Sequence, residues 1–146
     1  MSGVKLRRAR DSDYDFAERL YVESMKRLLT KLGMWNEQEV IARFKMYYQL
    51  DEVQIIAVDG KDVGWLQISE TDHDINLDQI HLEKGYRARG IGSRLIQDVM
   101  TDARAANKPV LLSVVRNNPA LALYRRLGFK VVGSDEQKLH MRWDRP

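Results

Sequence analysis

One segment, residues 75–115, restricts the fold more than any other part of the chain. It contains a β-type run from Ile75 to Leu82, a loop with closely spaced glycines, a run with apolar residues at helical spacing, and a second β-type run from Val110 to Val115. The second run is apolar on both faces, which is typical of a strand in a sheet that is covered on both sides. A strand, a helix and a strand in this order form a crossover between parallel strands. The segment therefore predicts an α/β fold whose sheet contains this parallel pair.

The rest of the chain predicts further strands and helices around this unit. Asp59-Gly60 is a strong hairpin turn between two short apolar runs. Ser12 resembles a helix start, and Gly128 suits the position just past the end of a short helix that follows Asn117-Asn118-Pro119. We predict one domain, residues 1–146, with a mixed sheet. The other expected strands are residues 4–8, 53–58, 63–69, 129–132 and 138–143, and the other expected helices cover residues 12–28, 40–48 and 91–103.

The composition argues against several classes of function. There are no cysteines, so the chain has no disulfide framework, no cysteine-bound metal and no thiol nucleophile. His73 and His140 are expected at the surface without a metal, because neither stands at metal-ligand spacing from another histidine. No apolar run approaches the roughly 18 residues of a membrane span, and the N-terminus lacks the apolar stretch of a signal peptide, which predicts a cytoplasmic protein. The basic residues are interleaved with 21 acidic ones, so nucleic acid is not an expected partner.

The loop from Arg87 to Ser93, between the strand and the helix, has the properties of an anion site. A helix start presents unpaired backbone N–H groups and the positive end of the helix dipole. Gly90 and Gly92 allow a phosphate to approach this backbone without a Cβ in the way, and Arg87 and Arg89 add positive charge. The loop is therefore predicted to bind a diphosphate.

Three other interpretations of this loop can be tested against its letters. A Walker A loop requires Gly-Lys followed by Ser or Thr, whereas the chain has Gly92-Ser93-Arg94. The dinucleotide fingerprint requires a third glycine where Leu95 stands and an acidic residue at the end of the next strand, where Val115-Arg116 has none. The third interpretation is a tight turn that closes against a helix and binds nothing, and the loop alone does not exclude it.

A second segment, which starts at Asn117, supports a binding role for the loop. The loop matches the pattern R/Q-x-x-G-x-G/A with Arg87, Gly90 and Gly92. The second segment matches N-x-x-A-x-x-x-Y-x-x-x-G-F with Asn117, Ala120, Tyr124, Gly128 and Phe129. With both patterns in this order and spacing, the chain resembles the GNAT superfamily of acetyl-CoA-dependent N-acetyltransferases. The expected order of strands and helices agrees with that family from end to end.

The resemblance implies how coenzyme A would be held. In this family the sheet is largely antiparallel and flanked by helices, but its two central parallel strands splay apart and pantetheine lies between them. Here those strands are Ile75–Leu82 and Val110–Val115, and the Leu82 N–H would polarise the thioester carbonyl. The resemblance assigns cofactor binding to the main chain of Ile80, His81 and Leu82, to the loop residues Arg87, Ala88, Arg89, Gly90, Ile91, Gly92 and Ser93, and to Asn117 and Tyr124.

The resemblance also implies direct transfer of the acetyl group to an amine, with no metal and no covalent enzyme intermediate. Tyr124 would place its hydroxyl near the sulfur and donate a proton to the leaving thiolate. An alkyl ammonium must first lose a proton at neutral pH, so a general base is useful. Many relatives place that base on the strand before the loop, at positions that fall here on Asn76 and Asp78. Asn76 cannot accept a proton, which leaves Asp78 acting through water, and His81 should face away from Asp78 by strand alternation.

The acceptor and its pocket are less clearly marked. Trp35 and Met34, with Tyr47 and Tyr48, either line an acceptor pocket or belong to the core. The acidic residues Glu70, Asp72, Asp74 and Asp78 either attract a cationic amine or form a solvated turn.

Two alternatives to the enzyme remain open from the sequence. One is a non-catalytic acyl-CoA-binding module of the same fold, because the usual glutamate is missing from the strand. The other is a basic nucleic-acid-binding domain. A homodimer is possible, since dimers are common in families of this kind.

Overall fold

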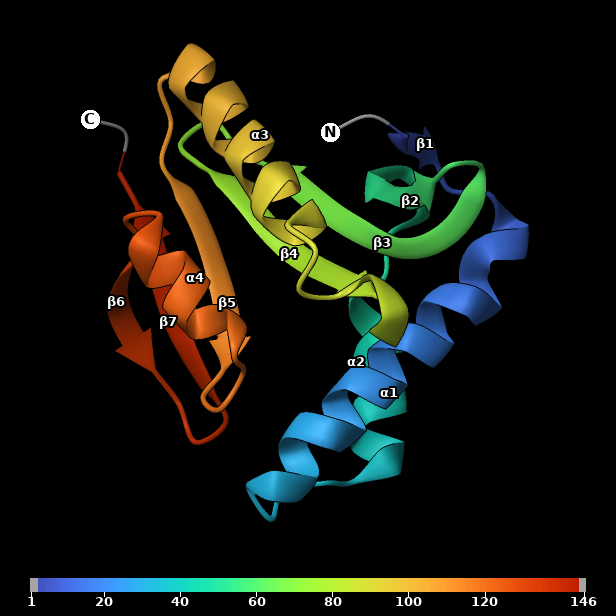
Figure 1. Ribbon diagram of the computed structural model, residues 1–146. Helices are drawn as coiled ribbons and strands as arrows, with labels where there is room; N and C mark the ends of the chain where they lie inside the picture. The colour runs from blue at the N-terminus through green and yellow to red at the C-terminus, as the bar shows by residue number, and fades with distance from the viewer. Residues whose placement is uncertain (1–2, 145–146) are drawn as a thin grey trace.

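The computed structural model, which describes residues 3–144, is a seven-stranded sheet with helices on both faces (Figure 1). The strand order is β1-β2-β3-β4-β5-β7-β6, and β4 and β5 are the parallel pair among otherwise antiparallel neighbours. This is the α/β mixed sheet that the sequence predicts. The strands are β1 (Val4–Arg8), β2 (Val53–Val58), β3 (Lys61–Glu70), β4 (Ile75–Leu82), β5 (Val110–Val115), β6 (Lys130–Ser134) and β7 (Lys138–Trp143).

The α-helices are α1 (Tyr14–Lys31), α2 (Glu37–Tyr47), α3 (Ile91–Ala106) and α4 (Ala120–Arg126), with 3-10 turns at Asp11–Asp13, Leu50–Glu52 and Lys84–Tyr86. None of the helices in the described residues is long and apolar enough to cross a membrane. The outermost residues of the predicted domain, 1–2 and 145–146, lie outside the described residues.

Helix α1 begins two residues later than predicted, because Asp13 is used by a local turn. Its carboxylate accepts the backbone N–H of Arg10 at 2.8 Å and both terminal nitrogens of Arg7 at 2.9 Å. These contacts hold residues 11–13 in a 3-10 turn, and the α-helix starts at Tyr14. Helix α2 starts earlier than its first apolar residue, because the Asn36 side chain accepts the N–H of Glu39 and caps the helix.

The apolar core has one part on each face of the sheet. Helix α3 buries its apolar side against β4 and β5, together with Tyr124 and Phe129, and its first turn packs on β2 and β3. Helices α1 and α2 cover the other face, around Trp65. Helices therefore pack on both faces of the sheet along β2 to β5, and the gap between β4 and β5 lies between these packed layers.

The parallel pair is joined only at one end. The ladder runs from Ile75 opposite Val110 to Leu77 opposite Leu112 and stops there. A β-bulge in β4 follows at once: Gln67 and Ile68 of β3 lie opposite Gln79 and Leu77, so Asp78 is the extra residue. Beyond the bulge the two strands diverge, as Figure 1 shows. The predicted splaying of the central strands is confirmed, and it begins where the bulge interrupts β4.

Candidate active site

The space between the diverging strands is a narrow slot of about 90 Å³. Its walls come from β4, β5, α1 and the start of α4, including Ile80, His81, Val114, Asn118 and Tyr124. The slot lies where the β4–β5 ladder has ended, so an extended chain placed there could pair with the free strand edges.

The edge of β4 offers free backbone groups to this slot. Glu83 N–H donates to Val63 O of β3 at 2.7 Å. Because successive N–H groups of a strand point to opposite edges, the N–H groups of Ile80 and Leu82 point away from β3, toward β5. Beyond Leu77 that strand is no longer paired with β4. The N–H groups of Ile80 and Leu82 are thus free toward the β5 side, where their role toward pantetheine stays a prediction, whereas the N–H of His81 points toward β3.

The diphosphate loop is open. Gly90 has φ +81°, Ala88 has φ +59°, and residues 88–90 are exposed. In the described chain none of the backbone N–H groups of residues 88–93 donates to another group, which is the state expected before an anion binds. A Cβ added to Gly92 would meet nothing within 4 Å. The mouth of α3 therefore has room for a diphosphate.

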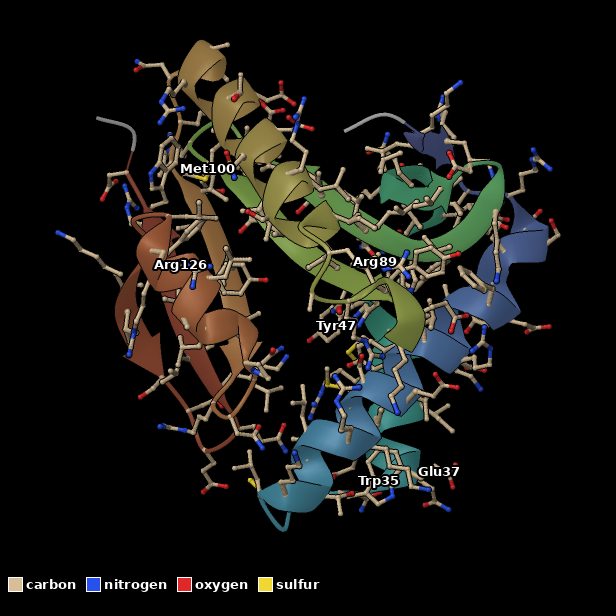
Figure 2. The ribbon with its side chains drawn as sticks, in the orientation of Figure 1. Trp35, Glu37, Tyr47, Arg89, Met100 and Arg126 are labelled. Carbon is tan, nitrogen blue, oxygen red and sulfur yellow. The ribbon has the colours of Figure 1, made fainter. Side chains whose placement is uncertain are left out.

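The two loop arginines are placed differently. Arg87 Nε donates to Leu82 O at 3.0 Å, which fixes the loop to the end of β4. The Arg89 guanidinium lies 4.9 Å from the ring centre of Tyr86 and is exposed at the loop (Figure 2). Arg87 thus shapes the loop, and Arg89 remains available to an anion. Gln97 Nε2 holds the Ser93 hydroxyl at 3.1 Å.

Tyr124 lies on the slot. Its side chain is buried, its ring packs edge-to-face on Phe129 at 5.8 Å, and burial raises the pKa of its hydroxyl to about 12. The hydroxyl is therefore protonated at neutral pH. Tyr124 is placed as predicted for a donor toward a group in the slot.

Asn117 is held from a different side. Its Nδ2 donates to Leu28 O of α1 at 3.1 Å, while its Oδ1 is buried without a partner in the described chain. The side chain thus ties the end of β5 to α1. Asn118, not Asn117, accepts the N–H of Ala120 at 2.9 Å and starts α4, as its position before Pro119 predicts.

His81 does not face away from Asp78, so the prediction from simple alternation is wrong. The bulge at Asp78 shifts the alternation by one residue, and both side chains reach the slot. The His81 ring packs against Trp65 and Tyr21 at 5.1 Å and 5.6 Å, and its Nε2 lies 2.7 Å from Gln79 Oε1. Burial, reinforced by the positive charges of Arg87, Arg27 and Lys138, lowers its pKa to about 3. A histidine with this pKa is a poor base at neutral pH.

This histidine should make the fold sensitive to acid. Between its ordinary pKa of 6.5 and its folded pKa of about 3, the unfolded chain binds a proton that the folded chain does not. Stability therefore falls as the pH drops through this window. We expect His81→Phe, which keeps the aromatic packing, to show a flatter decline of Tm from pH 7 to pH 4. The matched control is the exposed His73→Gln, and equal slopes in wild type and His81→Phe would contradict this account.

A larger cavity of about 760 Å³ adjoins the slot on the side of α2. Its walls come from α1, α2, β3, β4, β5 and the β6–β7 hairpin. The cavity and the slot share Tyr21, Leu77, Asp78, Gln79, Leu112, Ser113 and Lys138. A molecule in the cavity can therefore reach a group that lies in the slot.

Asp78 stands at this junction. Its side chain is open to the cavity, and Ser69 Oγ donates to it at 2.6 Å. Desolvation by the surrounding protein raises the pKa of the Asp78 carboxyl group, and the negative charge of Glu52 adds to this rise. The hydrogen bond from Ser69 lowers the pKa and offsets part of the effect. Asp78 is the predicted base, and its position and raised pKa suit proton transfer.

A second side chain that can accept a proton lies near the junction and was not predicted from the sequence. Ser113 Oγ lies 2.7 Å from His140 Nδ1, and His140 Nε2 lies 3.4 Å from Asp135 Oδ2. Ser113 and His140 are cross-strand neighbours on β5 and β7. His140 is thus a cavity residue and not simply a surface residue. The sequence pattern predicts that His140 lies in a strand, but only the pairing of β7 with β5 shows that Ser113 is its partner.

Two expectations about the acceptor side are settled by placement. Tyr47 and Tyr48 line the cavity. Trp35 lies in the loop between α1 and α2, away from the cavity lining, and the Lys26 ammonium lies 5.9 Å from the centre of its ring (Figure 2). Trp35 and Met34 therefore pack against the core. The acidic stretch is mainly a turn: Glu70 pairs with Lys108 at 2.6 Å, and Asp74 accepts from Thr71 and Asn76.

Comparison with known proteins agrees with this geometry. Residues 49–131 match the family model of the acetyltransferase (GNAT) domain. The mycothiol acetyltransferase of Corynebacterium glutamicum (strain R) is 31% identical over 108 residues, which cover 70% of this chain. The chain spans only 36% of that relative's length.

Solved structures share the fold at lower identity. The PaiA N-acetyltransferase from Thermoplasma acidophilum, in complex with coenzyme A, has a TM-score of 0.74 at 18% identity and covers 99% of this chain and 100% of its own. An N-acetyltransferase from Staphylococcus aureus Mu50 has a TM-score of 0.69 at 17% identity, covering 94% of this chain and 99% of its own.

Proposed function

The chain belongs to the GNAT acetyltransferase family, and from that premise we propose that it transfers the acetyl group of acetyl-CoA to a primary amine. The observation that carries the proposal is the junction of the slot and the cavity, which share Asp78, Ser113 and Lys138. A slot for the cofactor arm that opens into a separate polar cavity is the arrangement that two substrates require.

The described residues suit the diphosphate and the pantetheine arm of coenzyme A. The free N–H groups at the start of α3, with Arg89, suit the diphosphate. The N–H groups of Ile80 and Leu82 suit the amides of pantetheine, and Leu82 N–H suits the thioester oxygen. When bound, acetyl-CoA supplies an activated acyl group on a thiol of moderate pKa, so the protein needs mainly to orient the amine and to move one proton.

We propose that Asp78 accepts the proton that the amine loses. The amine enters from the cavity, and the Asp78 carboxylate, directly or through water, takes its proton. Tyr124 lies on the slot side and donates a hydrogen bond to the departing sulfur. His81 stays neutral and packs the wall between the two spaces.

The proposal is tested by following release of free thiol from acetyl-CoA with a panel of primary amines. Amine-dependent release is expected. The competing interpretation, an acyl-CoA-binding module without activity, predicts coenzyme A binding by calorimetry but no release with any amine.

We expect Tyr124→Phe to lower kcat by about tenfold to a hundredfold, the size of one lost hydrogen bond to a charged group. The effect should be smaller than for loss of a full acid, because a phenol with a pKa of about 12 transfers its proton only weakly to a thiolate. Initial-rate measurements with saturating acetyl-CoA give the value. An unchanged kcat would show that Tyr124 only packs against the core.

A further inference from the structure

Two cationic side chains, Arg43 of α2 and Lys138 of β7, line the acceptor cavity without a carboxylate partner. Neither forms a salt bridge within residues 3–144. The Arg43 guanidinium donates to Oε1 of the uncharged Gln137 side chain at 3.2 Å, and Gln137 lies in the β6–β7 hairpin. The Lys138 ammonium donates to no other group in the described chain. The cavity thus holds two positive charges that form no ion pair within the described residues.

The carboxylate nearest in sequence is already used. Asp135 Oδ1 accepts the backbone N–H groups of Gln137 and Lys138, at 2.8 Å and 2.7 Å, and Oδ2 faces His140. Burial, with a further contribution from Arg43, lowers the pKa of Lys138, and Asp135 offsets only part of this. Partly buried like charges cost free energy unless an anion joins them. An anion from solution is therefore the expected partner.

The cavity is also lined by acidic side chains. Asp78 projects from the bulge of β4, and Glu52 accepts a hydrogen bond from Gln67 Nε2 at 3.0 Å. Asp78 and Lys138 also line the slot. Hence charges of opposite sign stand at the place where the amine and the thioester must meet. A compound with an amine and a nearby anion matches both the acidic and the basic side chains of the cavity, whereas a plain polyamine leaves Arg43 and Lys138 without a partner.

We propose that the acceptor is a primary amine that carries an anionic group close to the reacting nitrogen, as in an amino acid with its carboxylate. Arg43 and Lys138 hold the anion, and Asp78 faces the amine. This inference rests on the proposed function, since it names the acceptor class of the same site. The aromatic residues Phe44, Tyr48 and Trp65 line the cavity beside these charges and suit an apolar substituent on the acceptor.

The test compares three matched acceptors: phenylalanine, its amide, and phenethylamine, with leucine and leucinamide as a second pair. We expect kcat/KM for the acids to exceed that for the amides and the amine by about tenfold or more, the size of a charge-assisted hydrogen bond. Arg43→Gln and Lys138→Gln should each remove most of this preference by raising KM for the acids, with little change for the amides.

Exposed lysines on the same elements provide the controls: Lys45→Gln on α2 and Lys130→Gln on β6 should keep the preference. Calorimetry should give an unchanged affinity of Arg43→Gln for coenzyme A. Acids and amides turned over equally well, or an equal loss for both in Arg43→Gln, would overturn the inference and leave the proposed function standing. If acetyl-CoA binds but no acceptor releases thiol, the proposed function itself fails.

Discussion

Replacing Gly92 by glutamate is expected to lower the affinity for coenzyme A by about a hundredfold or more, because the diphosphate loses several charge-assisted hydrogen bonds at once. Gly92 lies in the first turn of α3, and a Cβ there has open space around it. The new side chain would bring a negative charge to the helix start that is proposed to bind the diphosphate. Calorimetric titration with coenzyme A measures the loss.

The same substitution should not harm the fold. Glycine is a poor helix residue, and a carboxylate in the first turn of a helix is stabilising. Tm should thus be unchanged or slightly raised. Gly90→Glu is a less clean test, because Gly90 has φ +81°, where a side chain costs about 1–2 kcal/mol. Gly85→Glu adds the same charge nearby in open space and serves as the control. An unchanged affinity in Gly92→Glu would disprove the assignment of this loop.

Local sequence patterns predicted the fold well because each strand carries its own signal. The bounds of β1, β2, β4, β5 and β7 are those expected from the sequence. Val110–Val115 is apolar on both faces and is indeed a central strand with helices on both sides. The helix starts were less accurate, because a cap depends on where one side chain turns. The side-chain hydrogen bonds of Asp13 and Asn36 decided those starts.

The site was predictable only as far as it is local. The diphosphate loop and Tyr124 lie within short patterns; the structure places Tyr124 on the slot and leaves the loop exposed at the start of α3. The bulge at Asp78 has no signature in the sequence, since it arises from the pairing of β4 with β3. The contact of Ser113 with His140 and the approach of Arg43 to Gln137 join residues far apart in the chain. Such contacts depend on strand order, which spacing along the sequence does not encode.

The cavity beside the slot contains buried polar atoms that lower the stability of the fold. The hydroxyl of Tyr48, the Nε1 of Trp65 and the Oε1 of Gln67 are buried without a hydrogen-bond partner in the described residues, and all three residues line the cavity. Buried polar atoms without partners are destabilising. Together with the cations of Arg43 and Lys138, they form a surface that a polar ligand would complete.

Replacing Asp78 by asparagine should lower kcat by about 10²–10⁴-fold, the usual contribution of a general base. The affinity for coenzyme A should not change, because the loop at α3 is intact. In wild type the rate should fall as the pH drops through the pKa of Asp78, which lies above the ordinary value for a carboxyl group. This acidic limb should be absent from the pH profile of Asp78→Asn. Asp72→Asn, in the exposed turn after β3, is the matched control.

Stability separates this role from a structural one. Because the folded state raises the pKa of Asp78, the folded chain binds a proton more readily than the unfolded chain, and ionisation above that pKa costs stability. Asp78→Asn should thus have an equal or higher Tm at pH 7, despite its loss of activity. If instead Asp78→Asn keeps its rate while His140→Gln loses activity, the proton passes from the amine through Ser113 to His140. In that case Asp78 serves only to attract the amine.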